Sequence, residues 1–492
     1  MQTPRITRNW LADLSTELIR GLVRLCRIRG GEFHIAGGAV REWLAGRVSH
    51  DLDLTVRDNA FAWAETLADL LGAAFVPLDR EEGVARVVWQ GMDIDFCQYR
   101  GGATTLEADL GLRDFTVNAM AMVFDPSVPG LRPPYSVIDP TGGGDDFAAR
   151  RLKATSDKIF RDDPLRLLRA YRFVGELDFD LEPHTASLVQ RDAGLITEVA
   201  GERIAYELWR ILAVKRAHGV VAAMAANGLL TEVFPELGTG VGVEQPASHH
   251  LDVFAHNLEA LCQMEEIQAA PERFFPDQGQ GLAAYLDHAR NSAILKWAAL
   301  FHDLGKPATR DEKAGRFTFY QHERAGARQF ATIARRLGLS RADREQIGRL
   351  IELHMWPFHL NNVMRREGDV TARACLRLAK AVGDDLPGLF LLAMADSLAG
   401  QGEEKPLDME ESLARLYARV VMIYNEHIRP VLTHPRLLDG HDLQELFGLV
   451  PGPRFSTIFN GLEEAAVSGE VVSREQALQW VRAYLAQEGK EF

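Results

Sequence analysis

Two pairs of aspartates near the start of the chain have the spacing of metal ligands. Asp51 and Asp53 lie in the run HDLDLTV, and Asp93 and Asp95 lie in GMDIDFCQY. Because strand side chains alternate between the two faces of a sheet, each pair presents both carboxylates on one face. Carboxylates bind Mg²⁺, and phosphoryl transfer on two metal ions needs a third carboxylate that bridges the ions and activates the attacking oxygen. The two runs together predict such a site.

A glycine pair precedes the first aspartates. The run HIAGGAVREWLAGR predicts a strand, a turn at Gly37 and Gly38, and a helix whose first amides can approach a phosphate. Such a turn alone is most often structural, and a lone Asp-x-Asp is most often a solvated sheet face. Aspartate is disfavoured in strands, yet here it repeats directly after a phosphate-type turn. The combination favours a functional site.

Three arginines at three-residue steps follow Asp163. An aspartate followed by proline predicts a helix with Asp163 as its N-cap and the proline at its first position, and capping alone accounts for Asp163. It does not account for Arg166, Arg169 and Arg172 on a helix rich in leucine and aromatic residues. The chain has a net charge of −14, but residues 150–172 are locally basic, and we expect any RNA contact to begin there.

A second set of candidate metal ligands lies in the C-terminal half. Imidazoles with carboxylates suit transition metals or Mg²⁺, although a single helical histidine is more often a satisfied core or surface residue. His302 and Asp303 follow the apolar run ILKWAALF, so a charge at the buried end of that helix needs an ion or a partner. The set consists of His256, His302, Asp303, His322, His354 and Asp396.

The elements that must position these residues are of two kinds. β-rich runs at 33–38, 50–56, 85–99 and 116–124 alternate with helical patterns, and from about residue 150 the apolar residues recur at helical spacing. The predicted fold class is α+β, with a mixed sheet and helices followed by all-α domains. The breaks divide the chain into a head (1–145), a helical neck and body (146–245), a helical domain (246–400) and a helical C-terminal part (401–492).

Composition limits the class of protein further. A chain of 492 residues exceeds what one hydrophobic core usually organises. No run approaches the roughly 18 apolar residues of a membrane span, and the N-terminal residues lack the apolar core of a secretion signal. The four cysteines form no Cys-x-x-Cys pair, which argues against a disulfide framework or a thiolate zinc site. We expect a soluble, cytoplasmic protein without membrane partners; its oligomeric state is open.

The motifs and their order resemble a known family. GGAVREWLAG followed by HDLDLTV resembles the first signature of class II CCA-adding enzymes and bacterial poly(A) polymerases, members of the polymerase-β-like nucleotidyltransferase superfamily. LRDFTVNAMAM, DPTGGGD, DDPLR at residues 162–166 and the Glu202-Arg203 helix with Glu207 resemble later motifs of that family. The matches cover most of the chain and are strongest over residues 31–215. They imply a nucleotidyltransferase head and a neck and body that select the base and bind RNA.

The resemblance also assigns roles. It implies that Asp51, Asp53 and Asp95 are catalytic, with Mg²⁺ bound; Asp95 is chosen over Asp93 because Arg100 follows it by five residues, as in the family pattern. Asp93 is then a neighbour or a reserve ligand. Asp163 and Arg166 would pair with the edge of the incoming base in place of a template. The implied nucleotide-binding residues are Gly37, Gly38, Arg41, Arg113, Asp114, Asp163, Arg166, Arg169 and Arg172.

Two positions depart from the family pattern. Leu112 stands where the family usually has arginine, which removes one phosphate or ribose contact, and Asp162 replaces the usual glutamate.

The histidine and aspartate set resembles HD-superfamily phosphohydrolases, specifically the HD domain appended to some bacterial CCA-adding enzymes. The resemblance implies core ligands at His256, His302, Asp303 and Asp396, with His322 and His354 completing a second metal position or binding phosphate. The ion is open among Mg, Mn, Ni and Zn. The implied activity is phosphatase or 2′,3′-cyclic phosphodiesterase on RNA ends; a purely structural HD domain is the alternative. The tail resembles the C-terminal segment of HD-bearing members. Residues 451–453 (Pro-Gly-Pro) precede a helical run and could present its first amides to an RNA phosphate, but a simple turn explains them equally well.

The function implied is template-independent transfer of CMP and/or AMP from CTP and ATP to the 3′ end of tRNA, with release of pyrophosphate. A poly(A) polymerase shares these motifs, but some of those enzymes carry a basic C-terminal extension whereas this chain ends RAYLAQEGKEF, which favours tRNA. The other alternative is an RNA-binding protein with an inactive transferase head. Leu112 supports that alternative, and the intact carboxylates with Arg113 and Asp114 oppose it.

Overall fold

The computed structural model describes residues 4–7, 9–49, 51–124, 134–313 and 316–488, so the last four residues of the tail considered above lie outside it. The chain divides into two compact units. One comprises Met1–Val214 with Ala223–Val233, and the other comprises Lys215–Ala222 with Phe234–Phe492. The α+β fold class is confirmed: the first unit holds a mixed sheet with helices, and the second is nearly all helical. The finer division at residues 145, 245 and 400 stays a prediction.

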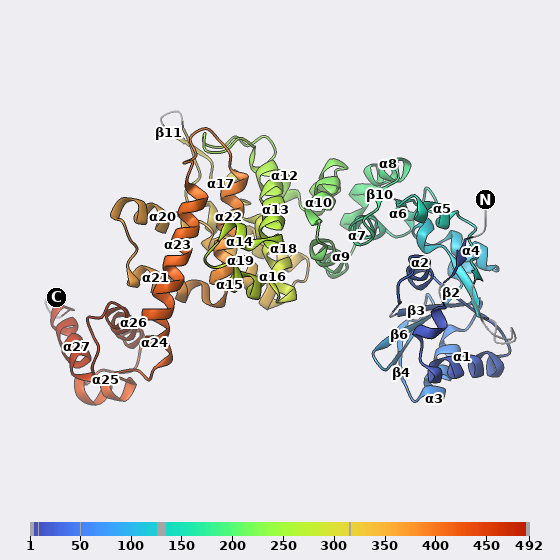
Figure 1. Ribbon diagram of the computed structural model, residues 1–492, viewed down its shortest axis with the longest axis horizontal. Coiled ribbons are helices and arrows are strands. Elements are labelled where there is room, and N and C mark those ends of the chain that lie inside the picture. Colours follow the sequence, from blue (N-terminus) through green and yellow to red (C-terminus); the bar gives the residue numbers. More distant parts are fainter. Residues whose placement is uncertain (1–3, 8, 50, 125–133, 314–315, 489–492) are drawn as a thin grey trace. The chain divides into compact units, whose positions relative to one another are not determined.

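A six-stranded sheet forms the centre of the first unit (Figure 1). Its strands lie in the order β4-β5-β6-β3-β2-β7, and within it β3 and β6 are parallel while the other neighbours are antiparallel. The parallel pair brings the two aspartate runs together, because Asp51 lies opposite Asp93 and Asp53 lies opposite Asp95. The strands are β2 Phe33–Ala36, β3 Asp51–Val56, β4 Ala74–Asp79, β5 Val84–Trp89, β6 Met92–Gln98 and β7 Ala121–Phe124.

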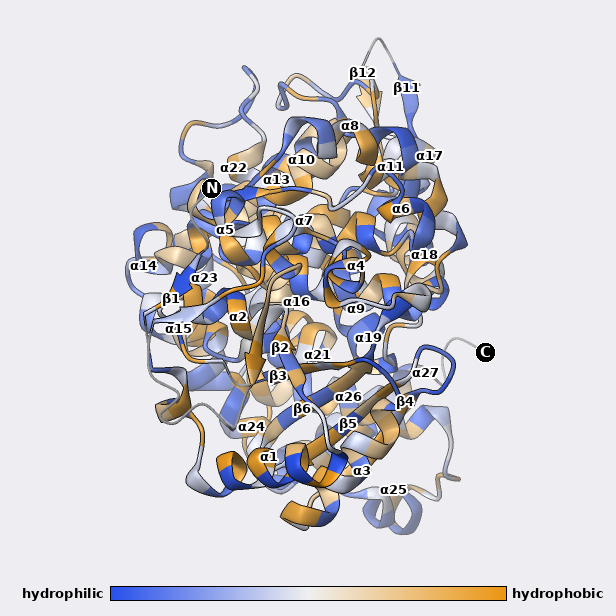
Figure 2. Ribbon diagram, turned by 90° about the vertical axis from the view of Figure 1, so that its right-hand side faces the viewer, coloured by the Kyte–Doolittle hydropathy of each residue, from blue (hydrophilic) through white to orange (hydrophobic). Residues whose placement is uncertain are grey.

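One face of this sheet packs against two amphipathic helices, α1 (Thr16–Arg29) and α3 (Ala60–Leu71). Figure 2 shows orange and blue alternating along both helices, as expected when one side of a helix faces a core and the other faces solvent. Leu52 and Leu54 of β3 are completely buried in the core that these helices cover. The aspartates alternate with these leucines, so they lie on the opposite face of the sheet.

The first unit continues from the sheet into helices. α7 packs against α9, and the Tyr171 hydroxyl of α7 accepts a hydrogen bond from the Asn227 side chain at 2.9 Å. The helices that matter for the site are α2 Gly38–Leu44, α4 Leu106–Gly111, α6 Ile159–Asp162, α7 Arg166–Leu177, α8 Pro183–Asp192 and α9 Gly201–Ala213, with the short 3₁₀ helix η3 Thr116–Asn118.

The second unit is built around helix α22 (Leu386–Ala399), which is apolar and buried on nearly all sides. It contacts α13, α16 and α23, and Asp396 is one of its few polar residues. A helix that is apolar all round belongs in the centre of a helical domain. The helices that pack on it include α13 Val253–Ala269, α16 Ala289–Phe301, α19 Arg341–Leu353, α20 Trp356–Glu367, α21 Ala372–Val382 and α23 Met409–Ile423. The second unit also contains α18 His322–Arg336 and three helices with a smaller core of their own, α25 Gly440–Phe447, α26 Pro453–Val467 and α27 Arg474–Glu488.

None of the helices in the described parts of the chain is both long enough and apolar enough to cross a membrane.

Candidate functional site

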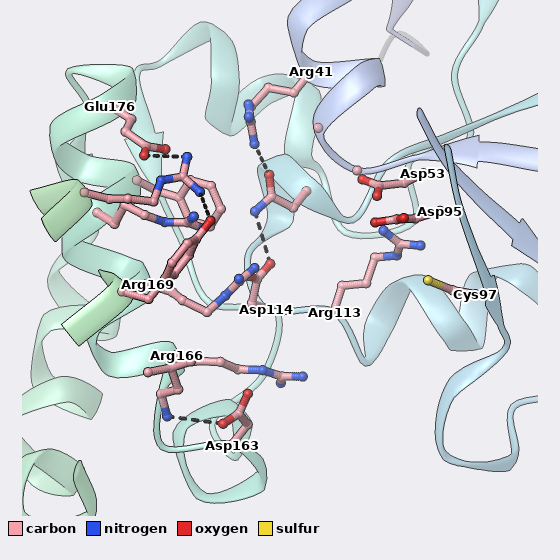
Figure 3. A pocket seen from close by; sticks show the side chains of 18 of the residues that line it. Arg41, Asp53, Asp95, Cys97, Arg113, Asp114, Asp163, Arg166, Arg169 and Glu176 are labelled. Atoms are coloured by element: carbon pink, nitrogen blue, oxygen red, sulfur yellow. Dashed lines mark hydrogen bonds and ion pairs between the residues drawn. The ribbon is translucent and has the colours of Figure 1, made fainter. Parts of the chain in front are cut away.

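The carboxylates of β3 and β6 lie at the edge of a 540 Å³ cavity in the first unit. Asp53 and Asp95 both line it, and Figure 3 shows their side chains next to each other. Asp51 and Asp93 form the next pair on the same sheet face, outside the lining of the cavity. The structure therefore brings Asp53 and Asp95 together at the cavity, with Asp51 exposed further along β3 on the same face.

Arg86 of β5 also faces these carboxylates, and the sequence reasoning missed it. It lies opposite Asp95 in the sheet, and its Nε and Nη2 donate to the two Asp95 oxygens at 2.7 and 2.9 Å. Its Nη1 donates to Asp93. Alternation in the run ARVVW places Arg86 on a definite face of its strand, but the sequence alone does not show that this strand lies beside β6.

The glycine turn lies directly against Asp53. Gly37 has a φ of +69°, and a Cβ there would lie 2.9 Å from Asp53 Oδ2 and 3.1 Å from an Arg113 guanidinium nitrogen, so a side chain is excluded by both backbone and space. Burial raises the pKa of Asp53, which Arg113 and the donating Gly38 N–H oppose. The turn thus presents its amides beside a carboxylate whose ionised form needs more positive charge, and a divalent ion would supply it.

A hydrogen-bond chain joins the head to helix α7. The carboxylate of Asp114 accepts from the Asn118 amide at 3.1 Å and from Arg169 at 2.5 and 3.0 Å, while Arg41 donates to the Asn118 side-chain oxygen (Figure 3). Burial opposes ionisation of Asp114, but Arg169 with these hydrogen bonds holds its pKa well below the usual range. The nearly buried Arg113 donates to Thr55 at 2.7 Å.

The three predicted arginines of α7 have different surroundings. Arg172 is buried against Glu207 of α9, with Nε 3.0 Å from the carboxylate, and Arg169 pairs with Asp114. Together with Arg41, both guanidinium groups lie over the Phe173 ring, at 4.3 to 5.4 Å from its centroid. The ion pair of Arg172 with Glu207 therefore holds α7 against α9. Phe173 and Glu207 orient this cluster, and neither was predicted as a site residue.

Asp163 and Arg166 line the same cavity. The predicted helix start is wrong by two residues: a turn of i to i+3 bonds follows Asp163, and α7 begins only at Arg166. The backbone of Asp163 itself is extended. Asp163 still accepts from the Leu165 N–H at 3.2 Å, so it caps that turn, and it lies 3.4 Å from Arg203 of α9. Arg166 donates to the backbone carbonyl of Leu112 at 3.3 Å.

The cavity as a whole combines two kinds of chemistry. Carboxylates on the sheet side can hold divalent metal ions, and the arginines on the helix side can neutralise phosphates. Asp163 and Arg166 offer an acceptor and a donor to the edge of a base. Its lining comprises Gly37, Gly38, Arg41, Asp53, Asp95, Cys97, Arg100, Arg113, Asp114, Asn118, Asp163, Leu165, Arg166, Arg169, Arg172, Phe173, Glu176, Arg203, Tyr206 and Arg210.

The second unit brings all six predicted histidines and aspartates together. They form two groups that could each hold a metal ion and that share Asp303: one of His256, His302, Asp303 and Asp396, and one of Asp303, His322 and His354. All six residues are buried.

The histidine orientations fit metal ligation. Nδ1 of His302, His322 and His354 lies 2.7 to 2.9 Å from a backbone carbonyl, to which it can donate, so each Nε2 faces the cluster and is placed to ligate a metal ion. Nε2 of His322 lies 3.2 Å from Nε2 of His354. Two lone pairs that face each other in a buried site repel unless a cation lies between them. Lys306 Nζ lies 2.5 Å from one oxygen of Asp303, and Nε2 of His322 lies 3.3 Å from the other.

The histidine cluster opens to a cavity of 650 Å³. Its lining includes His322 and Asp396 of the cluster, together with His249, Lys306, Tyr320 and Phe358. A molecule that enters this cavity can therefore reach both metal-binding groups.

Comparison with known proteins addresses the identity of both units. The chain matches the "Poly A polymerase head domain" over residues 33–153, the "Probable RNA and SrmB-binding site of polymerase A" over 178–239 and the "HD domain" over 253–400. An A-adding tRNA nucleotidyltransferase of Deinococcus radiodurans is 35% identical over 92% of this chain and 95% of its own length. The chain belongs to the tRNA nucleotidyltransferase and poly(A) polymerase family.

Other members of the tRNA nucleotidyltransferase family agree with this assignment. A CC-adding tRNA nucleotidyltransferase of Thermus thermophilus is 32% identical over 91% of this chain and 92% of its own length. The CCA-adding enzyme of Thermotoga maritima, solved in complex with tRNA, has the same fold, with a TM-score of 0.62 at 19% identity over 99% of this chain and all of that one. The resemblance drawn from the sequence motifs is thereby confirmed.

The two departures from the family pattern lie at positions that the structure describes. The Leu112 side chain is 41% exposed, and its backbone carbonyl accepts the hydrogen bond from Arg166 described above. The hydrogen bond to Arg166 therefore uses the backbone of residue 112, which any residue at this position would supply. Asp162 is exposed at the end of α6, and nothing in the structure explains the replacement of glutamate there.

The geometry of the histidine cluster leads to a prediction about metal content. We expect the purified protein to retain a divalent metal, and Asp303→Asn to weaken that binding by more than about tenfold, because Asp303 is shared by both groups. Inductively coupled plasma mass spectrometry after dialysis against metal-free buffer measures this. Asp311→Asn, an exposed aspartate of the same unit, is the matched control. Equal metal content in wild type and Asp303→Asn would show that Asp303 is not a ligand.

Proposed function

We propose that this chain transfers AMP and/or CMP from ATP and CTP to the 3′ end of tRNA without a template, releasing pyrophosphate. The observation that carries the proposal is the parallel pairing of β3 with β6, which places Asp53 and Asp95 side by side on a cavity otherwise lined by arginines. Family membership supports the same reaction, and the relatives named above add A or CC to tRNA. An enzyme that acts on tRNA would work in the cytoplasm.

The sheet side of the cavity would carry the chemistry. Asp51, Asp53 and Asp95 are the residues we propose as ligands for two Mg²⁺ ions, and four carboxylates on one sheet face fit divalent cations. The bound ions would polarise the α-phosphate and favour the ionised 3′ hydroxyl. Gly37 and Gly38 would leave backbone amides free to approach the triphosphate, and Arg113 and Arg41 would neutralise its charge.

The helix side of the cavity would choose the base. Cytosine and adenine both carry an amine on the pairing edge, whereas uracil and guanine carry a carbonyl there. We propose that Asp163 accepts from that amine and Arg166 donates to the neighbouring ring nitrogen or carbonyl. Arg203 beside Asp163, and the Leu112 carbonyl beside Arg166, would hold the two side chains apart at a fixed spacing. Arg169 and Arg172 would support this surface through Asp114 and Glu207.

A second activity is favoured by the histidine cluster. Its two metal-binding groups share a carboxylate and open to a cavity that holds Lys306, which suits hydrolysis of a phosphate ester. We propose phosphatase or 2′,3′-cyclic phosphodiesterase activity on RNA ends for this unit. Mn²⁺, Ni²⁺, Zn²⁺ and Mg²⁺ all fit a set of imidazole and carboxylate ligands.

The transfer reaction is tested with tRNA and single nucleotides. We expect purified wild-type protein to extend tRNA that lacks its 3′ CCA, or tRNA that ends in CC, with CTP or ATP and not with UTP or GTP. Asp53→Asn should lower the rate by more than about a hundredfold, because it removes a metal ligand at the cavity. Asp58→Asn, an exposed aspartate just after β3, is the control and should retain the wild-type rate. Extension by Asp53→Asn at the wild-type rate would refute the metal site, and long homopolymeric A tails would identify a poly(A) polymerase instead.

Base choice is tested at Arg166. We expect Arg166→Ala to lower the preference for C or A over U and G by about 10-fold to 100-fold, because one good hydrogen-bonding pair to a base is worth about 1–3 kcal/mol of discrimination. Binding of tRNA should change little. Competition between nucleotides at equal concentration measures the preference, with Arg24→Ala, exposed on α1 and outside the cavity, as the charge-matched control. An unchanged preference in a folded Arg166→Ala protein would contradict base reading by this residue.

A further inference from the structure

Arg86 is the cation that directly contacts two of the four sheet carboxylates, and the reaction described above does not use it. It lies on β5, in register with Asp95 of β6, and its three guanidinium nitrogens are divided between two aspartates. We propose that Arg86 is a positioning residue for the transferase site: it fixes Asp95 toward the cavity and takes Asp93 out of the set of metal ligands. This inference rests on the proposed transfer reaction.

The contact with Asp95 fixes the orientation of that carboxylate. Nε and Nη2 of Arg86 approach the two Asp95 oxygens at 2.7 and 2.9 Å, which is the fork-to-fork geometry of a guanidinium and a carboxylate. A carboxylate has about four acceptor positions, so this pair leaves about two for metal ions. Asp95 also lines the cavity, whereas Arg86 does not. The carboxylate is therefore held from the β5 side while it remains available on the side of Asp53.

The contact with Asp93 explains how the chain chooses between two aspartates of the same strand face. Asp93 and Asp95 alternate along β6 in the same way as Asp51 and Asp53 along β3, so alternation alone makes them equivalent. Asp93 does not line the cavity, and its carboxylate accepts a hydrogen bond from Nη1 of Arg86. The guanidinium of Arg86 neutralises the charge of Asp93, and a divalent ion would have to displace it to bind to Asp93.

Arg86 remains charged in this setting. An arginine guanidinium keeps its charge at every pH at which the protein would be assayed. A lysine could supply the same charge, but a compact ammonium cannot hold two carboxylates in one plane. Both the charge and the planar fork therefore contribute, and they can be separated by substitution.

Kinetics with variants of the full-length protein test this assignment. Arg86→Gln is expected to lower kcat for nucleotide addition by about 10-fold to 100-fold, the range for residues that orient a metal ligand, while the KM for nucleotide and for tRNA changes less than about threefold. Arg86→Lys should recover only part of the loss. Asp93→Asn should cost less than about threefold, and Asp95→Asn should cost far more. Arg80→Ala removes an exposed arginine from the turn between β4 and β5 and is the charge-matched control.

Metal binding gives a second readout that does not depend on activity. In an Asp303→Asn background, which weakens the histidine clusters, Mn²⁺ titration followed by electron paramagnetic resonance reports the head. Arg86→Gln should bind Mn²⁺ at least about threefold more tightly than the wild-type protein, because Asp93 is released as a further ligand and one positive charge beside four carboxylates is lost. The ion would then be drawn away from the position that Asp53 and Asp95 define, which is why kcat falls although binding does not. Weaker Mn²⁺ binding in Arg86→Gln would overturn the assignment. Thermal unfolding compares the stability of each variant, so a folding defect is recognised separately.

Three kinetic outcomes would also overturn it. A raised KM for nucleotide with an unchanged kcat would make Arg86 a phosphate-binding residue. Loss of activity in Asp93→Asn equal to that in Asp95→Asn would make Asp93 a metal ligand. Unchanged kinetics in Arg86→Gln would leave Arg86 without a role in the reaction. If the wild-type protein extends no RNA, the proposed reaction itself fails, and the Mn²⁺ titration still decides whether Arg86 controls the charge of the carboxylate site.

Discussion

The parallel, in-register pairing of β3 with β6 is the interaction on which the candidate transferase site depends. It places Asp51 beside Asp93 and Asp53 beside Asp95 on one sheet face, and it therefore concentrates four negative charges within two strands. Strands tolerate such a concentration only where cations compensate it. Arg86 supplies one from β5, and Arg113 lies near Asp53. Burial raises the pKa of Asp53, which lies directly against the glycine turn at Gly37.

The same physical logic operates in the second unit with different groups. Six buried histidines and aspartates converge there, and backbone carbonyls lie within hydrogen-bonding distance of Nδ1 of three histidines, so that their Nε2 atoms face inward. In both units, groups of the same kind lie close together, which costs free energy, and a bound divalent cation would offset that cost. The clusters lie in separate compact units with separate cores, which is consistent with two activities carried by one chain.

Much of the candidate site follows from the sequence because it rests on local rules. Alternation in DLDLTV and MDIDF predicted the carboxylate faces, and an apolar helix ending in His302 and Asp303 predicted a buried charge that needs an ion. Residues that act across the fold were not predictable in this way: Arg86, Asn118, Phe173 and Glu207 acquire their partners only when β5 joins β6 and α7 packs on α9. The start of α7 was misplaced for a local reason, since Asp163 caps a turn of i to i+3 bonds and not the α-helix itself.

The central claim is that β3 and β6 jointly hold divalent metal at the arginine-lined cavity. The most direct measurement is anomalous X-ray scattering from crystals grown with Mn²⁺ and a non-hydrolysable ATP analogue. We predict anomalous density between the carboxylates of Asp53 and Asp95, next to the triphosphate, with Asp93 still bound to Arg86. Density at Asp93, or Mn²⁺ at the histidine clusters without any at Asp53 and Asp95 while the nucleotide occupies the cavity, would contradict the account.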